Sequence, residues 1–140
     1  GLPLLPLLAY LRDRHGIAVI MITHDLGIVA QVCSRVIVMY AGHIVEEAPV
    51  AALFKQPGHP YTNGLMRARP RIHKQADRLE VISGRVPPGT AFPDGCRFAP
   101  RCSLATPQCR KTPPALEPFG DDPSHRVACY EAKRMAAKIT

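Results

Sequence analysis

Hydrophobic and polar positions divide the chain into a regular front third and an irregular remainder. Apolar residues recur at helical spacing through 4–15, "LLPLLAYLRDRH", and Gly16 is a natural stop for a helix there. Residues 17–23, "IAVIMIT", are apolar at six of seven positions without alternation. This pattern predicts a strand buried on both faces of a parallel sheet. Asp25 can then cap a short helix that runs to Val32.

The following residues predict a hairpin and then several short helices. Residues 35–40, "RVIVMY", form a second apolar strand, "AGH" is a turn, and "IVEEA" at 44–48 is a return strand. Pro49 can open a helix in "PVAALFKQ", and "PGHPYTNGLMRARP" predicts a turn followed by another helix. The pattern is weak over 69–93, where we expect mostly loop. The last ten residues, 131–140, predict a short polar helix or a frayed tail.

The order of these elements indicates an α/β fold that is incomplete within this sequence. Helix and strand alternate over the first 40 residues, which is typical of the α/β class. A strand that is apolar on both faces needs other strands at both edges and further layers above and below it. We therefore expect the front end to be the tail of a larger α/β domain. Thirteen of the 15 prolines lie at or after Pro49, so the rest should be rich in turns.

Composition and charge narrow the classes of protein and partner. The 140 residues are 46% apolar, which argues against disorder throughout, and the net charge of +7 favours an anionic partner. Nucleotide, nucleic acid, a membrane surface and an anionic cofactor all satisfy that charge. No apolar run reaches the roughly 18 residues that span a bilayer. The default expectation is a cytosolic protein, in which clustered cysteines are more often metal ligands than disulfides.

Four of the five cysteines form a group with the spacing C-x5-C-x6-C-x19-C: Cys96, Cys102, Cys109 and Cys129. The close C-x2–4-C pairs of zinc knuckles are missing, and wide gaps suit a larger body such as a [4Fe–4S] cluster. The close cysteine run of bacterial ferredoxins is missing too, so cluster, zinc and free thiols all remain open from the spacing. Basic neighbours should lower the thiol pKa values and favour metal binding without choosing the metal. These neighbours are Arg97, Arg101, Arg110, Lys111 and Arg126.

Other cysteine and histidine residues have more ordinary interpretations. Cys33, in "AQVCSR", is predicted to be a small buried thiol on a helix. His125, four residues before Cys129, could be a metal ligand or a donor near the ligands, but a turn residue is the favoured interpretation. His59 and Tyr61 are expected to serve packing and turn geometry around a proline.

His24 directly follows the predicted buried strand. Ligands of open parallel sheets bind beyond the carboxyl ends of the strands, so this side chain could contact a phosphate or a nucleophilic water. Most histidines at such a position are turn or capping groups, and position alone does not decide between the two roles.

Three segments in the same order resemble one protein family. "GIAVIMITHDLGIVAQVCSRVIVMYAGHIVEEA" closely resembles the end of an ABC transporter nucleotide-binding domain. "GHPYTNGLMRARP" resembles the HPYT segment of ATP-binding subunits of dipeptide, oligopeptide and nickel importers. "VPPG…FPDGCRFAPRC" resembles the cysteine-bearing extension of that subfamily.

The resemblance implies an α/β fold class: the C-terminal remnant of a P-loop-type ABC nucleotide-binding domain followed by a small, loop-rich, Cys-ligated module. It implies that 1–48 end the nucleotide-binding domain and that 49–86 are connecting helices and loop. Residues 87–130 would be the C-terminal four-cysteine module of oligopeptide transporters, and 131–140 a tail.

The resemblance also implies residue roles. His24 would be the catalytic switch histidine that contacts the γ-phosphate of ATP, and Asp25 a helix cap. Cys96, Cys102, Cys109 and Cys129 would hold a [4Fe–4S] cluster, with zinc as the alternative. The sequence contains no phosphate loop, no family signature stretch and no Asp-Glu pair for Mg²⁺. ATP and Mg²⁺ are therefore expected only in a full-length protein, and this piece alone should not hydrolyse ATP.

The implied partners are a second ATP-binding subunit and two transmembrane permease subunits, with an extracytoplasmic solute-binding protein acting indirectly. The implied location is peripheral, at the cytoplasmic face of the bacterial inner membrane, and the solute is a di- or oligopeptide, with nickel still open. Two alternatives compete: a free-standing metal-binding interaction module, and a basic zinc-bearing nucleic-acid binder. A nucleic-acid partner is not expected, because the basic residues are dispersed and aromatic residues are few.

Overall fold

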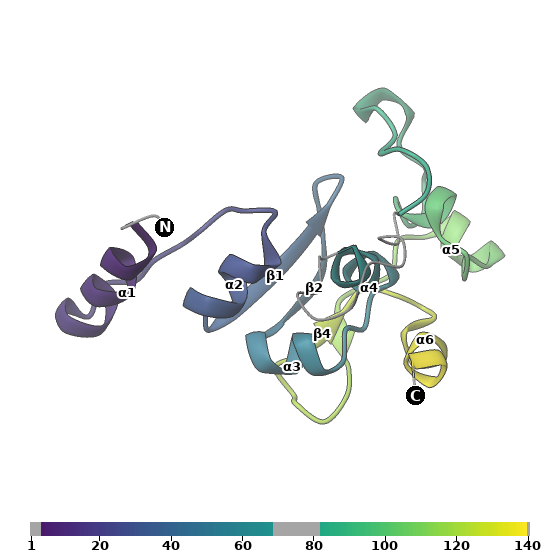
Figure 1. Ribbon diagram of the computed structural model, residues 1–140. Helices are drawn as coiled ribbons and strands as arrows, with labels where there is room; N and C mark the ends of the chain where they lie inside the picture. Colours follow the sequence, from purple (N-terminus) through teal and green to yellow (C-terminus); the bar gives the residue numbers. More distant parts are fainter. Residues whose placement is uncertain (1–3, 69–81, 140) are drawn as a thin grey trace, which may run out of the picture.

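The computed structural model describes residues 4–68 and 82–139 (Figure 1). Part of the loop predicted at 69–93 therefore lies outside the described residues. The front half contains α1 (Leu4–His15), α2 (Leu26–Val32), β1 (Arg35–Tyr40), β2 (His43–Pro49), α3 (Val50–Lys55) and α4 (Pro60–Arg67). The second half contains η1 (Gly89–Ala91), η2 (Ala99–Arg101), α5 (Pro107–Lys111), β3 (Glu117–Pro118), β4 (Arg126–Val127) and α6 (Ala132–Ile139).

The sheet is antiparallel and joins the two halves of the chain. Its strand order is β1-β2-β4-β3, and every neighbouring pair runs antiparallel. The hairpin turn between β1 and β2 has Ala41 and Gly42 at positive φ, 49° and 82°, as expected for a tight two-residue connection. Mixed α/β character is thus confirmed, while a parallel sheet is not found among the described residues.

The strand predicted over residues 17–23 is wrong in this structure. The segment has no regular hydrogen-bonded structure, and Ile20 and Ile22 are 93% and 97% exposed. A strand exists only when a second strand satisfies its backbone groups. The apolar pattern marks residues suited to burial, but the described part of the chain brings no strand to their edge. The segment instead crosses from α1 to α2 as an extended connection (Figure 1).

The predicted helices of the front third are confirmed. α1 ends at His15, followed by Gly16 with a φ of +62°, the left-handed conformation that glycine adopts easily. The carboxylate of Asp25 accepts hydrogen bonds from the backbone N–H groups of Gly27 and Ile28, which makes it the N-cap of α2. The tail at the end of the chain is also helical, as α6. Among the described residues, no helix has the length and apolar character that crossing a bilayer requires.

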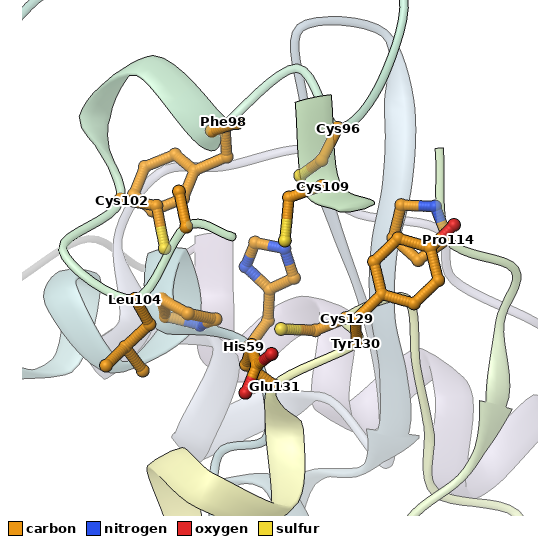
Figure 2. Close-up of a pocket in the computed structure, with 13 residues that line it drawn as sticks. His59, Cys96, Phe98, Cys102, Leu104, Cys109, Pro114, Cys129, Tyr130 and Glu131 are labelled. Carbon is orange, nitrogen blue, oxygen red and sulfur yellow. The ribbon is translucent and has the colours of Figure 1, made fainter. Parts of the chain in front are cut away.

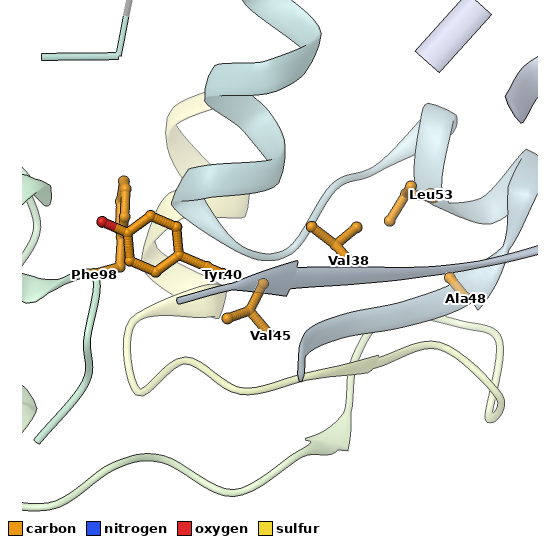
Figure 3. Packing of buried hydrophobic residues seen from close by; sticks show 6 residues of the cluster. All are labelled: Val38, Tyr40, Val45, Ala48, Leu53 and Phe98. Atoms are coloured by element: carbon orange, nitrogen blue, oxygen red, sulfur yellow. The ribbon is translucent and has the colours of Figure 1, made fainter. Parts of the chain in front are cut away.

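The main core lies between the β1–β2 hairpin and the segments that follow it (Figure 3). Alternation along β1 buries Val38 and Tyr40 and leaves Ile37 and Met39 more than half exposed. Phe98, from the cysteine segment, packs edge-on against Tyr40 with ring centroids 5.2 Å apart. The cysteine segment is therefore anchored to the hairpin by its own aromatic residue. The buried members of this cluster are Val38, Tyr40, Val45, Ala48, Leu53 and Phe98.

Candidate functional site

Short turns fold the first three cysteines onto one another. The Cys96 N–H donates to the carbonyl of Cys109 at 2.7 Å, which fixes two cysteines across a gap of 12 intervening residues. Between them, Ala99 N–H donates to Cys96 O and Cys102 N–H to Ala99 O, at 3.0 and 3.2 Å. Pro100 and Pro107 lie in the first turns of η2 and α5, where the missing N–H costs nothing.

Gly95 makes the close crossing at Cys96 and Cys109 possible. A Cβ at this position would overlap the carbonyl oxygen of Cys109 and the backbone of Arg110. Backbone atoms cannot yield as a flexible side chain can, so Gly95→Ala should force apart the two segments that cross here, the turn at Cys96 and the helix α5. We expect a loss of about 1–3 kcal/mol in the free energy of unfolding, measured by denaturant titration of the full chain. Gly89→Ala is the matched control, since its Cβ would make only an ordinary contact with Phe92.

Cys129 reaches the same region through the sheet. β4 pairs with β2, and the N–H of Ala128 donates to the carbonyl of Val45 at 2.8 Å. The long C-x19-C gap is therefore the length of chain that forms β3, its turn and β4 before returning. Sequence spacing alone could not reveal that a strand of the hairpin places the fourth cysteine.

All four cysteines line one pocket, together with His59 and Phe98 (Figure 2). They are free thiols, and Cys109 is the most buried, at 7% exposed. As the side chains stand, no three His, Cys, Asp or Glu side chains among residues 4–68 and 82–139 are grouped tightly enough to hold one metal ion. The pocket lining nevertheless contains four cysteine sulfur atoms. Four cysteine sulfurs are the donor set of a [4Fe–4S] cluster.

Backbone N–H groups face the sulfur atoms in this pocket. Phe98 and Ala99 offer theirs to Cys96, and Leu104 and Ala105 offer theirs to Cys102. Hydrogen bonds of this kind stabilise a thiolate and offset the negative charge of a thiolate-ligated cluster. The local turns therefore supply backbone donors to two of the four sulfur atoms, and in the type of its donor atoms the pocket suits a cluster.

The pKa values of three of these thiols are raised, contrary to the prediction from basic neighbours. Burial is the largest cause for Cys96, Cys102 and Cys129, and it raises the pKa of Cys129 to about 12. The other thiols of the group add to each rise, so the four sulfur atoms are close enough to interact. Cys96, Cys102 and Cys129 are therefore neutral at pH 7, and ligating a metal requires that they release their protons.

Three of the five basic side chains bind elsewhere, which explains why they do not lower these pKa values. Arg97 donates to the carbonyl of Ala41, and its guanidinium lies over the ring of Phe92. Arg101 donates to the carbonyl of Ser83 at 2.9 Å and to the hydroxyl of Tyr40 at 3.2 Å. Arg126 donates to the carbonyl of Leu116 and pairs with Glu47. These arginines bind the segments together instead of facing the thiols.

Glu46 lies at the centre of a buried network that the sequence did not reveal. Its side chain is fully buried, and its two carboxylate oxygens accept from the backbone N–H groups of Gly58 and His59 at 2.8 and 2.9 Å. The ring of His125 shares one of these oxygens through Nε2 at 2.5 Å. One carboxylate thus connects β2, the turn before α4 and the turn before β4. The sequence signal for this role is an acid that falls on the buried face of the strand, beside an acid, Glu47, on the other face.

His125 combines a turn backbone with a buried ring. Its N–H closes a turn onto the carbonyl of Asp122, which agrees with the favoured interpretation. The ring, 3% exposed, bonds to Glu46 and does not line the pocket of the cysteines. In this structure the His125 ring belongs to the hydrogen-bond network around Glu46, and it does not lie beside the four pocket thiols.

His59 caps α4 and is buried against Phe98, which confirms the predicted packing and turn roles. Its Nδ1 accepts a hydrogen bond from the backbone N–H of Tyr61 at 3.0 Å. The ring centroids of His59 and Phe98 are 5.7 Å apart. Burial lowers the pKa of His59 to about 3, so its ring is neutral.

His24 lies on an exposed loop, outside the pocket of the cysteines. Its neighbours fix the backbone on either side: Asp25 N–H donates to Thr23 Oγ1 at 3.0 Å, and the Asp25 carboxylate caps α2. His24 therefore lies one residue before the N-cap of α2, with its side chain exposed.

Cys33 follows α2 directly and is half-buried, so the prediction of a buried helical thiol was wrong in its degree of burial. It takes no part in the pocket. It therefore offers a control cysteine for experiments on the other four.

Comparison with known proteins finds similarity to peptide transport proteins. Residues 45–109 match the family described as oligopeptide/dipeptide transporter, C-terminal region. A protein of Brucella ovis named as a peptide import ATP-binding protein is 39% identical over 140 residues, covering 96% of this chain and 41% of the relative. A protein of Sinorhizobium fredii named as a peptide ABC transporter ATP-binding protein is 47% identical over 133 residues, covering 94% of this chain and 39% of the relative. The chain spans about two fifths of the length of these relatives.

Proposed function

We propose that this chain, whose residues 45–109 match the oligopeptide/dipeptide transporter C-terminal region, is the C-terminal part of the ATP-hydrolysing subunit of a peptide importer. The observation that carries the proposal is the continuous similarity to relatives named for peptide import and ATP binding, over nearly all of the chain. The transported solute of the whole protein would be a di- or oligopeptide.

The proposed organisation follows the segments inferred from the sequence. Residues 1–48 are the end of a P-loop-type nucleotide-binding domain, 49–86 connect it onward, 87–130 form the four-cysteine module and 131–140 are a tail. The pairing of β2 with β4 and the position of Phe98 in the main core support a module that packs directly on the nucleotide-binding part. The two parts would then move as one body.

In the full-length subunit, His24 would act as the switch histidine toward ATP and Mg²⁺ bound by the preceding part of the domain. The Asp25 cap and the Thr23 hydroxyl hold the backbone on both sides of it. A ring nitrogen held in this way can orient the attacking water and stabilise charge that develops on the γ-phosphate. The exposure of His24 is compatible with this role, in which the ring would contact ATP bound by another part of the full-length subunit.

Replacing His24 with alanine should therefore reduce ATP hydrolysis by the full-length subunit about 100-fold or more, with little change in stability. The assay uses proteoliposomes that contain the subunit with its permease partners, and it follows ATP hydrolysis and uptake of a labelled dipeptide. His15→Ala, another exposed histidine, is the control and should retain both activities. Equal activity of the two variants would contradict the role of His24. Absence of peptide uptake with the unsubstituted protein would contradict the importer function.

We propose further that Cys96, Cys102, Cys109 and Cys129 hold a [4Fe–4S] cluster. When bound, such a cluster supplies a rigid four-point crosslink that can also take up or release one electron. The chain's residues bind it through four sulfur atoms, exclude water with Phe98 and Leu104, and direct backbone N–H groups at the sulfurs. Its role would be to brace subunit contacts or to connect the ATPase to the redox state of the cell.

The proposed partners are a second ATP-binding subunit and two membrane-embedded permease subunits, with a solute-binding protein acting from the other side of the membrane. The names of the relatives support this assembly, since peptide import across a membrane by an ATP-binding protein needs a pathway through the bilayer. The proposed location is the cytoplasmic face of the bacterial inner membrane, where the permease subunits would hold the protein peripherally.

A further inference from the structure

The imidazole of His59 lies in the pocket of the four cysteines although it is 36 residues or more from each of them in sequence. It lines the pocket, and Figure 2 shows its ring among the side chains of Cys102, Cys109 and Cys129. With 1% of its surface exposed, it is among the most buried side chains of the molecule. A buried polar ring at this position requires an account of its hydrogen bonds.

Three contacts fix the position and the tautomer of this ring. The carboxylate of Glu46 accepts the His59 backbone N–H at 2.9 Å, and Phe98 packs against the ring. Nδ1 accepts the N–H of Tyr61, so it carries no proton. In a neutral imidazole the proton then lies on Nε2, which is a donor. Nε2–H is therefore the donor that this ring can offer to the pocket, which the ring lines.

We infer that His59 donates its Nε2–H to sulfur of the group bound by the four cysteines. The inference rests on the proposed cluster site and adds a residue from outside the cysteine segment to it. His59 is a positioning and tuning residue: it stabilises negative charge on sulfur and is not itself a ligand. Because the pocket walls are apolar, each hydrogen bond to sulfur acts at low dielectric and has a strong effect.

The same donor connects the cluster to the rest of the protein. The His59 backbone is held by Glu46 of β2, and its ring caps α4, so a change of charge on sulfur reaches both elements through one residue. Hydrogen bonds to cluster sulfur stabilise the more negative, reduced state and raise the reduction potential. Loss of the donor should lower that potential without removing any of the four sulfur ligands.

His59→Asn separates this role from the helix cap. Asparagine is a favourable N-cap, so it can still accept the Tyr61 N–H, but its shorter side chain brings no N–H to the position of Nε2. The experiment titrates the full chain, purified without oxygen, and compares the reduction potential of the variant with that of the unsubstituted protein. His43→Asn is the matched control, because His43 lies in the hairpin and does not line the pocket.

The expected result is a shift to lower potential for His59→Asn, with iron content and the His43→Asn potential unchanged. An unchanged potential in His59→Asn, with the cluster present, overturns the inference and leaves the cluster site standing. Absence of iron and sulfide in the unsubstituted protein overturns the cluster site itself, and the inference with it.

A second measurement needs no variant and applies if His59→Asn fails to retain iron. Pulsed EPR of the reduced, unsubstituted protein containing ¹⁵N-labelled histidine reports nitrogen nuclei close to the unpaired electron. A resolved histidine coupling supports the Nε2–H···S hydrogen bond. A spectrum without one overturns it.

Discussion

Glu46→Ala is expected to lower the free energy of unfolding by about 3–5 kcal/mol, since it breaks a buried charged network by removing its only acceptor. The substitution leaves three donors without a partner in a region that water does not reach: the N–H groups of Gly58 and His59, and the ring of His125. Each orphaned donor bears a desolvation cost, and the side chain also leaves a cavity behind. Denaturant titration of the full chain, followed by circular dichroism, measures the change.

The neighbouring acid provides the control. Glu47 is partly exposed and pairs with the exposed Arg126 at 3.4 Å, so Glu47→Ala should cost only about 0–1 kcal/mol. Glu46→Gln keeps the shape and one acceptor oxygen, and should fall between the two alanine variants. Failure of Glu46→Ala to show cooperative unfolding agrees with the prediction. Equal stability of the two alanine variants would show that the network contributes nothing.

Cys109→Ser is expected to remove the iron and sulfide from the purified protein. Cys109 is the most buried of the four pocket cysteines, and its carbonyl anchors Cys96. Serine keeps the size and the backbone hydrogen bond but replaces a soft thiolate with a hard hydroxyl that remains protonated. A cluster held by these cysteines would then be one ligand short at its most buried corner, where solvent cannot supply a replacement ligand. Iron analysis and the visible absorption of the protein report the loss.

Cys33→Ser is the matched control for this experiment. It makes the same chemical change at a half-buried thiol that does not line the pocket, so iron content should stay at the level of the unsubstituted protein. If Cys109→Ser keeps its full iron and sulfide, Cys109 is not a ligand. If both variants lose iron equally, the effect comes from general destabilisation.

Capping and turn rules correctly predicted the elements that depend on residues close together in the sequence. The stop at Gly16, the cap at Asp25 and the hairpin turn at Ala41 and Gly42 each depend on residues within one or two turns of chain. Such signals can be read from sequence because glycine conformation and capping act over three or four residues.

The errors have one physical origin, which is contact between distant residues. The strand predicted at 17–23 needs a neighbour that the described residues do not provide, and the sheet gained β4 from about 80 residues further along the chain. The thiol pKa values followed burial and not the sequence proximity of arginines, because those arginines found carbonyl partners elsewhere. Burial and partner choice are properties of the folded chain.

The candidate site was partly visible in the sequence. Spacing selected the four cysteines, and the structure places all of them on one pocket. His59 was recognised only for its turn, because nothing in "GHPYT" shows that its ring meets cysteines that follow much later. Glu46 was missed for the same reason: its partners lie 12, 13 and 79 residues away.

The central claim, that the four cysteines hold an iron–sulfur cluster, is tested most directly by counting iron and acid-labile sulfide per chain after purification without oxygen. The account predicts about four of each per chain, together with the broad visible absorption of a cluster. About one zinc per chain without sulfide would contradict it and would make the pocket a zinc site. Absence of any metal from the freshly purified protein would contradict it as well.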